Sequence, residues 1–137
     1  MILSGLIAAT FLGGQLGESC EGVGSDSNNN IYVTGGTFSP SPAFPTTAGA
    51  YQATRNSTIS AFVAVFNRDL TALRYATYIG GAGNSTGRTT AVRAEGRFTI
   101  GGIGQNGWPL QNATGGAVSG GDDHGVIADL TVPLGPG

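Results

Sequence analysis

Hydroxyl, carboxylate and imidazole groups gather in one stretch of the chain, between Ser119 and Gly125. A hydrolase triad would use Ser119, Asp122 and His124, but a triad needs its members on separate elements that converge beside an oxyanion hole. These three residues share one short loop. A single histidine and a single cysteine also exclude the usual zinc ligand sets. We therefore predict that the chain is not an enzyme and that this stretch is a solvated turn, with Asp122 and Asp123 as the candidates for contacting a metal ion.

A second polar stretch, Asp26–Asn30, carries oxygen ligands at alternating positions, as calcium loops do. It lacks the glycine and the distant bidentate glutamate of an EF-hand. Its counterpart later in the chain, Ala94–Arg97, has the composition of a turn but not the oxygen ligands. A hairpin turn is therefore the leading interpretation. Calcium held by Asp26 and Asn28 is the alternative, and no other cofactor is expected.

Cys20 is the only cysteine, so no disulfide can form within the chain. The carboxylates of Glu18 and Glu21 are close in sequence and would raise the pKa of its thiol. Because the reactive form of cysteine is the thiolate, we predict a small, semi-buried structural residue.

Charge and composition exclude several partners. Only 10% of the 137 residues are charged, the net charge is −2, and the six basic residues are scattered singly. Nucleic acid is not expected as a partner, because no basic stripe is present. The apolar stretch 1–12 is too short to span a bilayer, and no basic residue precedes it as in a signal peptide.

Three Asn-x-Ser/Thr sequons, at Asn56, Asn84 and Asn112, are candidate glycosylation sites. In a chain this rich in Asn, Ser and Thr, the alternative is that they are turn residues that match by chance. With the absence of lysine and the low charge, they favour an extracellular protein.

The chain repeats itself, and Ala9 of the first copy recurs as Ala76 of the second. The matched landmarks are Ala9–Gly14 with Ala76–Gly81, Ile31–Gly36 with Phe98–Gly102, Phe44-Pro45 with Trp108-Pro109, Gly49-Ala50 with Gly116-Ala117, and Ala61–Phe66 with Gly125–Leu130. Several ordered landmarks at nearly constant spacing indicate two copies of one structural unit.

Each unit consists of short apolar runs separated by glycine-rich turns, without a long helical period. We predict an all-β chain with strands at Leu6–Leu12, Glu21–Ser25, Asn30–Gly35, Ala61–Asn67, Leu73–Ile79, Thr89–Ala94, Phe98–Gly102 and Val126–Val132. The run Ala61–Phe66 is apolar at consecutive positions, which predicts a strand covered on both faces. Phe44 and Trp108 are expected to anchor the loop between the second and third strands.

Several phrases resemble the SBBP-type β-propeller repeat of bacterial cell-surface and secreted proteins. They are Tyr75–Gly81, Asn30–Gly36, Phe44–Thr47, Gly49–Gln52 and Ala61–Asn67. The resemblance covers nearly the whole chain in two copies, of which the second is degenerate. The family often has an aspartate before its Ala-Phe-Val strand, where this chain has Ser60 and His124, so no role of that aspartate is carried over.

This resemblance implies two four-stranded antiparallel propeller-type blades in an extracellular structural or interaction module. Residues 1–14 would be the closing strand of a preceding blade, 15–81 the first blade, and 82–137 a second blade that lacks its outer strand. We therefore expect the N-terminal strand to complete the last blade of a neighbouring subunit, which gives a ring or a filament of identical copies.

The residues expected at this contact are apolar. They are Leu6, Ile7, Phe11 and Leu12 on the added strand, and Val126, Ile127 and Leu130 on the receiving strand. Two alternatives stay open. The chain could be a fragment of a longer propeller, or it could be a module that binds glycans or proteins on a surface around Trp108.

Overall fold

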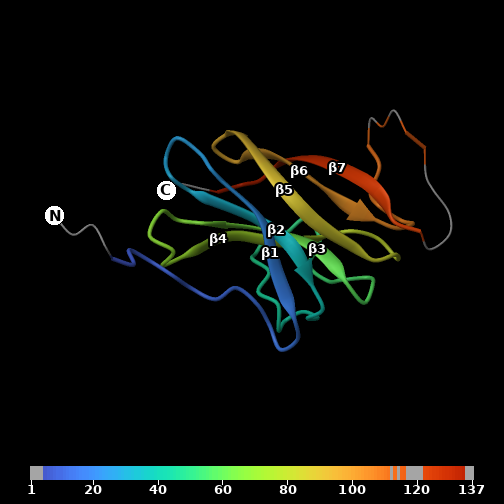
Figure 1. Cartoon of the computed structure of the whole chain (residues 1–137), viewed down its shortest axis with the longest axis horizontal. Helices are drawn as coiled ribbons and strands as arrows, with labels where there is room; N and C mark the ends of the chain where they lie inside the picture. Colours follow the sequence, from blue (N-terminus) through green and yellow to red (C-terminus); the bar gives the residue numbers. More distant parts are fainter. Residues whose placement is uncertain (1–4, 112, 114, 117–121, 135–137) are drawn as a thin grey trace.

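The computed structural model describes residues 5–111, 113, 115–116 and 122–134, and every regular element in these ranges is a β-strand (Figure 1). The strands are β1 (Glu18–Ser25), β2 (Ile31–Thr37), β3 (Ser60–Phe66), β4 (Leu73–Ile79), β5 (Ser85–Ala94), β6 (Arg97–Gly104) and β7 (His124–Thr131). They form two open antiparallel sheets, β1-β2-β3-β4 (sheet 1) and β5-β6-β7 (sheet 2). The predicted all-β class is confirmed.

Strand β3 lies in the interior, and all seven of its residues are buried. Its β-branched and aromatic side chains suit a strand that is packed on both faces. Alternate residues, such as Val63 and Val65, face sheet 2, whereas Phe62 and Phe66 face the opposite way. The prediction that this run is covered on both faces is therefore confirmed.

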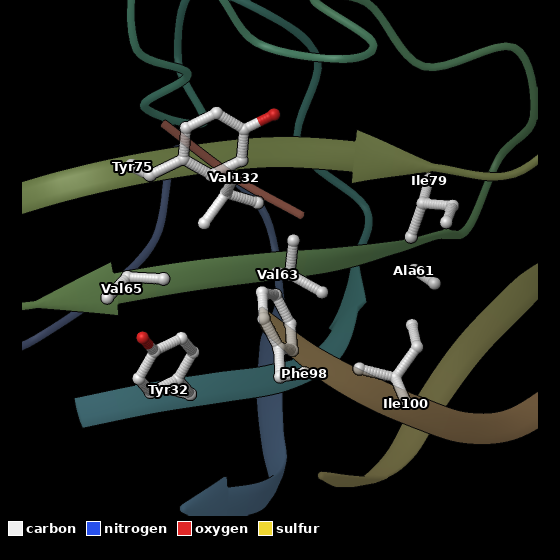
Figure 2. Packing of buried hydrophobic residues seen from close by; sticks show 9 residues of the cluster. All are labelled: Tyr32, Ala61, Val63, Val65, Tyr75, Ile79, Phe98, Ile100 and Val132. Atoms are coloured by element: carbon white, nitrogen blue, oxygen red, sulfur yellow. The ribbon is translucent and has the colours of Figure 1, made fainter. Parts of the chain in front are cut away.

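A cluster of buried side chains between the two sheets holds them face to face (Figure 2). It consists of Tyr32, Ala61, Val63, Val65, Tyr75, Ile79, Phe98, Ile100 and Val132. The rings of Tyr32 and Phe98 join β2 to β6, with their centroids 5.0 Å apart. The sheets also approach closely at Gly87, where a Cβ atom would lie 1.9 Å from Thr34 Oγ1.

A second cluster covers the other face of sheet 1. Its centre is Phe44, which comes from the loop between β2 and β3 and is fully buried. The Phe44 ring centroid lies 5.0 Å from that of Phe62 and 5.2 Å from that of Tyr78. Phe44 therefore anchors this loop, as predicted.

The sequence repeat is also a repeat of strand pairing. In sheet 1, Glu18 lies opposite Thr37, and in sheet 2, Ser85 lies opposite Gly104. Ser85 follows Glu18, and Gly104 follows Thr37, by the same number of residues that separates Ala76 from Ala9. The first strand of each sheet also carries a register shift at the same place, between Cys20 and Gly22 and between Gly87 and Thr89.

The next pair of strands agrees as well. Ile31 on β2 lies opposite Phe66 on β3, and Phe98 on β6 lies opposite Leu130 on β7. The residues His124–Leu130 of β7 therefore correspond to Ser60–Phe66 of β3 at one constant offset, the one that separates Leu130 from Phe66. Three strands of sheet 2 reproduce the first three strands of sheet 1, and β4 has no counterpart in sheet 2 among the described residues.

The expected strand at Leu6–Leu12 is not formed within this chain, because residues 5–14 pair with no other strand. A strand needs the edge of another strand, and this segment leaves sheet 1 on the side away from sheet 2 (Figure 1). The other seven predicted strands are present, with ends that differ by a few residues.

Candidate functional site

The outer edges of the two sheets are treated differently. In sheet 1, the loop after β2 covers the edge of β4: Thr47 N donates to Ala76 O at 3.1 Å, Ala76 N donates to Thr47 Oγ1 at 3.0 Å, and Tyr78 N donates to Gln52 O at 3.1 Å. In sheet 2, the edge of β7 away from β6 makes no such backbone hydrogen bond to any described residue. An edge of this kind is a template for another strand.

A groove runs along this open edge. It is formed by two adjoining hollows of about 460 Å³ and 620 Å³ that share Pro109, Leu110, Gln111 and Ile127. Trp108 lines the first hollow, and Tyr75 and Ile79 of β4 line the second. The groove therefore lies where a strand beside β7 would pack over β4, which the repeat alone did not reveal.

The inward face of β7 is apolar. Val126, Ala128 and Leu130 are half-buried and alternate with more exposed residues, of which Ile127 is 76% exposed. Ala128 and Leu130 pack against the cluster between the sheets. Of the predicted receiving residues, Val126 and Leu130 thus face sheet 1, whereas Ile127 lies on the outer face.

The N-terminal segment offers apolar side chains to solvent. Leu6 is 85% exposed, and Ile7 and Phe11 are fully exposed. Leu12 differs, because it packs against the second cluster on the far face of sheet 1. Directly after it, Gly14 lies against Ser39, where a Cβ atom would be 2.6 Å from Ser39 Cβ. The segment is thus attached on the side of sheet 1 opposite the groove, and it pairs with no strand of its own chain among the described residues.

The outer face of sheet 2 carries an ion-pair group. Arg97 Nη2 donates to Asp129 Oδ2 at 2.7 Å, Thr99 donates to Asp129 Oδ1 at 3.1 Å, and Arg93 lies 3.7 Å from the same carboxylate. The Arg97 hydrogen bond is the main cause that lowers the pKa of Asp129. Since these groups are exposed, they contribute little to stability.

Asp26 belongs to a network between the two sheets. Its Oδ1 accepts from Asn28 N at 2.9 Å and Asn30 N at 3.0 Å, and its Oδ2 accepts from Asn30 Nδ2 at 2.9 Å and Tyr32 Oη at 2.8 Å. The side chain of Asn28 donates to Glu95 in the β5–β6 turn. Four donors thus fill the acceptor positions of the Asp26 carboxylate, and the predicted hairpin turn is confirmed.

Electrostatics at this network favour a charged carboxylate and a neutral phenol. Burial opposes ionisation of Asp26, but the hydrogen bonds from Asn30, Tyr32 and Asn28 outweigh it and lower the pKa of Asp26. Burial, with the nearby Asp26 and Glu95 carboxylates, raises the pKa of Tyr32 to about 12.

The other metal candidates lie elsewhere. Asp123 Oδ1 accepts from Gln105 Nε2 at 3.3 Å, and both Asp122 and Asp123 are exposed. They precede β7 beside Gly104, at the far end of β6 from the Asp26 network. Nowhere in the described ranges do three His, Cys, Asp or Glu side chains gather. Ser119 lies outside the described residues, so the structure does not place it relative to His124.

The sequence reasoning missed one match to a hydrolase motif. The pattern Gly-x-Ser-x-Gly occurs at Gly83-Asn-Ser85-Thr-Gly87. In hydrolases that serine lies exposed on a turn that leads into a helix. Here Ser85 is buried at the start of β5, accepts from Ala61 N at 3.0 Å and donates to Ile79 O at 3.4 Å. Its hydroxyl therefore holds the two sheets together.

Cys20 is exposed on β1. Desolvation and the Glu18 carboxylate raise the pKa of its thiol, as predicted for Glu18. Its exposure contradicts the expected semi-buried position, because β1 is an edge strand of sheet 1 and is exposed over Ser19–Glu21.

Two of the three sequons can be placed. Asn56 is exposed in the loop before β3, whereas Asn84 is half-buried and its Oδ1 accepts from Ile59 N at 3.1 Å. Asn112 lies outside the described residues. Asn56 is thus the more accessible acceptor.

Trp108 is half-buried between the groove and the cluster between the sheets. Its indole nitrogen is buried without a hydrogen-bond partner among the described groups. Sequence reasoning identified Trp108 but missed Ile79 and Leu110 as groove residues. The anchoring role predicted for Trp108 from its correspondence with Phe44 agrees with its packing against this cluster.

Comparisons with known proteins add no relative. No family model matches the chain, and no curated protein is significantly similar to it. The resemblance to the SBBP-type repeat therefore stays a prediction. Over the part of the chain that the structure describes, no helix has the length and apolarity that a membrane crossing requires.

Proposed function

We propose that this chain is an extracellular structural subunit of propeller-type repeats that associates with copies of itself. Residues 6–12 of one copy add to the open edge of β7 in the next copy as the fourth strand of sheet 2. Complementarity carries this proposal: an open edge beside a groove that Trp108, Ile79 and Leu130 help to line occurs in a chain that also bears exposed apolar side chains in a segment with the pattern of β4. The head-to-tail contact gives a ring or a filament.

The physical driving force is the burial of apolar side chains together with new ladder hydrogen bonds. Complete burial of a side chain such as Leu6 or Phe11 is worth about 1.5–3 kcal/mol. Association itself costs roughly 4–15 kcal/mol, so one strand of this length gives modest affinity. We therefore expect association over a concentration range of about 1 to 100 µM, where dissociation constants correspond to roughly 5–8 kcal/mol.

The extracellular location has separate support. It comes from the resemblance to secreted repeats, from the low charge, and from the exposed sequon at Asn56. The low charge and the sequon do not concern the strand-addition contact, whereas the resemblance supports both parts of the proposal.

Light scattering coupled to gel filtration tests the self-association. The full chain should show a mass that rises with concentration, and Phe11→Asp should stay monomeric because burial of an unpaired carboxylate beside Trp108 is costly. Asn56→Asp adds the same charge on a remote exposed loop and should associate like the parent chain. A folded parent chain that remains monomeric at about 100 µM, a concentration at which a Kd of about 10 µM would give mostly oligomer, would overturn the proposal.

A binding module is the second candidate, favoured by one observation. Trp108 lines the groove, and its buried indole N–H has no acceptor among the described groups, which suits a ligand with a hydroxyl or carbonyl group. Retention on a glycan array that Trp108→Ala abolishes and Phe11→Asp preserves would favour this function over self-association.

A further inference from the structure

The repeat in strand pairing also indicates how a fourth strand would pair with sheet 2. Both β1–β2 and β2–β3 have the same register as their counterparts in sheet 2. The edge of β7 therefore presents its backbone groups in the positions in which β3 presents its own to β4.

The pairing of β3 with β4 then predicts the pairing of β7 with an added strand. In sheet 1 the pairs on one face are Phe62 with Tyr78, Ala64 with Ala76, and Phe66 with Leu73. In the repeat, Leu130 corresponds to Phe66 and Ala9 corresponds to Ala76. The transferred pairs are Val126 with Phe11, Ala128 with Ala9, and Leu130 with Leu6.

We infer that residues 6–12 of one copy add to β7 of the next in this register, and that Phe11 completes an apolar core with the neighbour's Trp108. The inference rests on the proposed function and specifies which residues make the contact. Its central pair is Ala9 with Ala128, two small residues where sheet 1 also has two alanines, Ala64 and Ala76.

The side-chain faces agree with this register. Val126, Ala128 and Leu130 are the alternate β7 residues that point toward sheet 1. Their partners on the added strand, Phe11, Ala9 and Leu6, would point toward sheet 1 as well. There they would meet Tyr75 and Ile79, which project from β4 into the cluster between the sheets (Figure 2). A slip of one residue would turn Phe11 to solvent and place Thr10 in the groove, which the apolar side chains of Trp108 and Val126 disfavour.

The aromatic contact also has a counterpart. In sheet 1, the Tyr78 ring lies against Phe44, which comes from the loop after β2. Trp108 occupies the corresponding loop position, and it lines the groove together with Val126. Phe11, in the place of Tyr78, would therefore cover the indole of the neighbouring copy.

Intermolecular disulfides test the register. In a Cys20→Ser background, Ala9→Cys is mixed with Ala128→Cys, Val126→Cys or Leu130→Cys, and the mixed dimers are followed under mild oxidation. The Ala128→Cys mixture should cross-link at least about fivefold faster, because directly opposite Cα atoms are within disulfide range and diagonal ones lie near or beyond its limit. Preference for Val126→Cys or Leu130→Cys in an associating chain overturns the register but not the proposed function. A monomeric chain overturns both.

The single tryptophan reports on the aromatic contact directly. Fluorescence emission should shift to the blue as the concentration rises through the association range, because Phe11 removes water from the indole. Phe11→Ala should raise the midpoint concentration at least about tenfold, as truncation of an interface anchor does, and the matched Thr10→Ala less than about threefold. Association without any change in Trp108 emission, or equal effects of the two substitutions, would overturn the role of Phe11 while leaving self-association intact.

Discussion

The hydroxyl of Tyr32 donates a hydrogen bond to Asp26 Oδ2 at 2.8 Å and accepts one from Gly96 N at 2.7 Å. Asp26 begins the β1–β2 turn and Gly96 lies in the β5–β6 turn, so this one hydroxyl joins the corresponding turns of the two repeats. All three groups are in the interior of the contact between the sheets. The network thereby fixes how the two sheets are placed relative to each other at this end.

Tyr32→Phe should destabilise the chain by about 1–3 kcal/mol, because it leaves the Asp26 carboxylate and the Gly96 N–H with one partner fewer in a buried site. Urea unfolding followed by circular dichroism measures this loss. Tyr51→Phe removes a hydroxyl from an exposed ring and should change the free energy of unfolding by less than about 0.5 kcal/mol. Equal effects of the two substitutions would show that the Tyr32 network contributes nothing to stability.

Stability should fall in acid partly through Asp26. Its pKa is lower in the folded chain than the value of about 3.9 in an unfolded chain. The carboxylate therefore stabilises the fold above that unfolded value, and the contribution is lost as the pH falls through the folded pKa. The stability difference between the parent chain and Asp26→Asn should shrink as urea titrations are taken from neutral pH into this acidic range. Asp129→Asn, at an exposed ion pair, should show a smaller change.

Gly87→Ala should destabilise the contact between the sheets. A Cβ atom at this position would lie 1.9 Å from Thr34 Oγ1, so β2 and β5 must move apart or Thr34 must change rotamer. Overpacking of this kind costs about 1–3 kcal/mol. Gly116→Ala is the matched control, since a Cβ atom there meets no atom of the described residues within 4 Å. Thermal unfolding midpoints compare the two variants, and an unchanged midpoint for Gly87→Ala would refute the close approach.

Phe44→Ala should be the most damaging loop substitution. The ring is fully buried against Phe62 and Tyr78, and truncation of a buried phenylalanine costs about 3–5 kcal/mol. The loss should also free the loop that covers the edge of β4, which amide hydrogen exchange at Ala76 and Tyr78 would detect. Tyr51→Ala, in the same loop but exposed, should leave this protection intact.

Much of the fold could be predicted from local pattern. The consecutive apolar residues of Ala61–Phe66 indicated a strand buried on both faces, and the regularly spaced landmarks, such as Ala9 and Ala76, indicated two similar units. Both follow from side-chain periodicity and turn residues, which act over a few positions. The Leu6–Leu12 segment shows the limit of this reasoning: it has the composition of a strand, but strand formation depends on an available edge.

The sequence by itself determined the strands, their order and the repeat, because alternation, β-branching and glycine-rich turns are local properties of the chain. Only the tertiary structure decided that the edge of β4 is covered by Thr47 and Gln52 while the edge of β7 is open toward the described residues, and that a groove lies beside it. Such features depend on where a loop comes to rest and on which sheet faces meet. Those are contacts between residues far apart in sequence, and no local pattern encodes them.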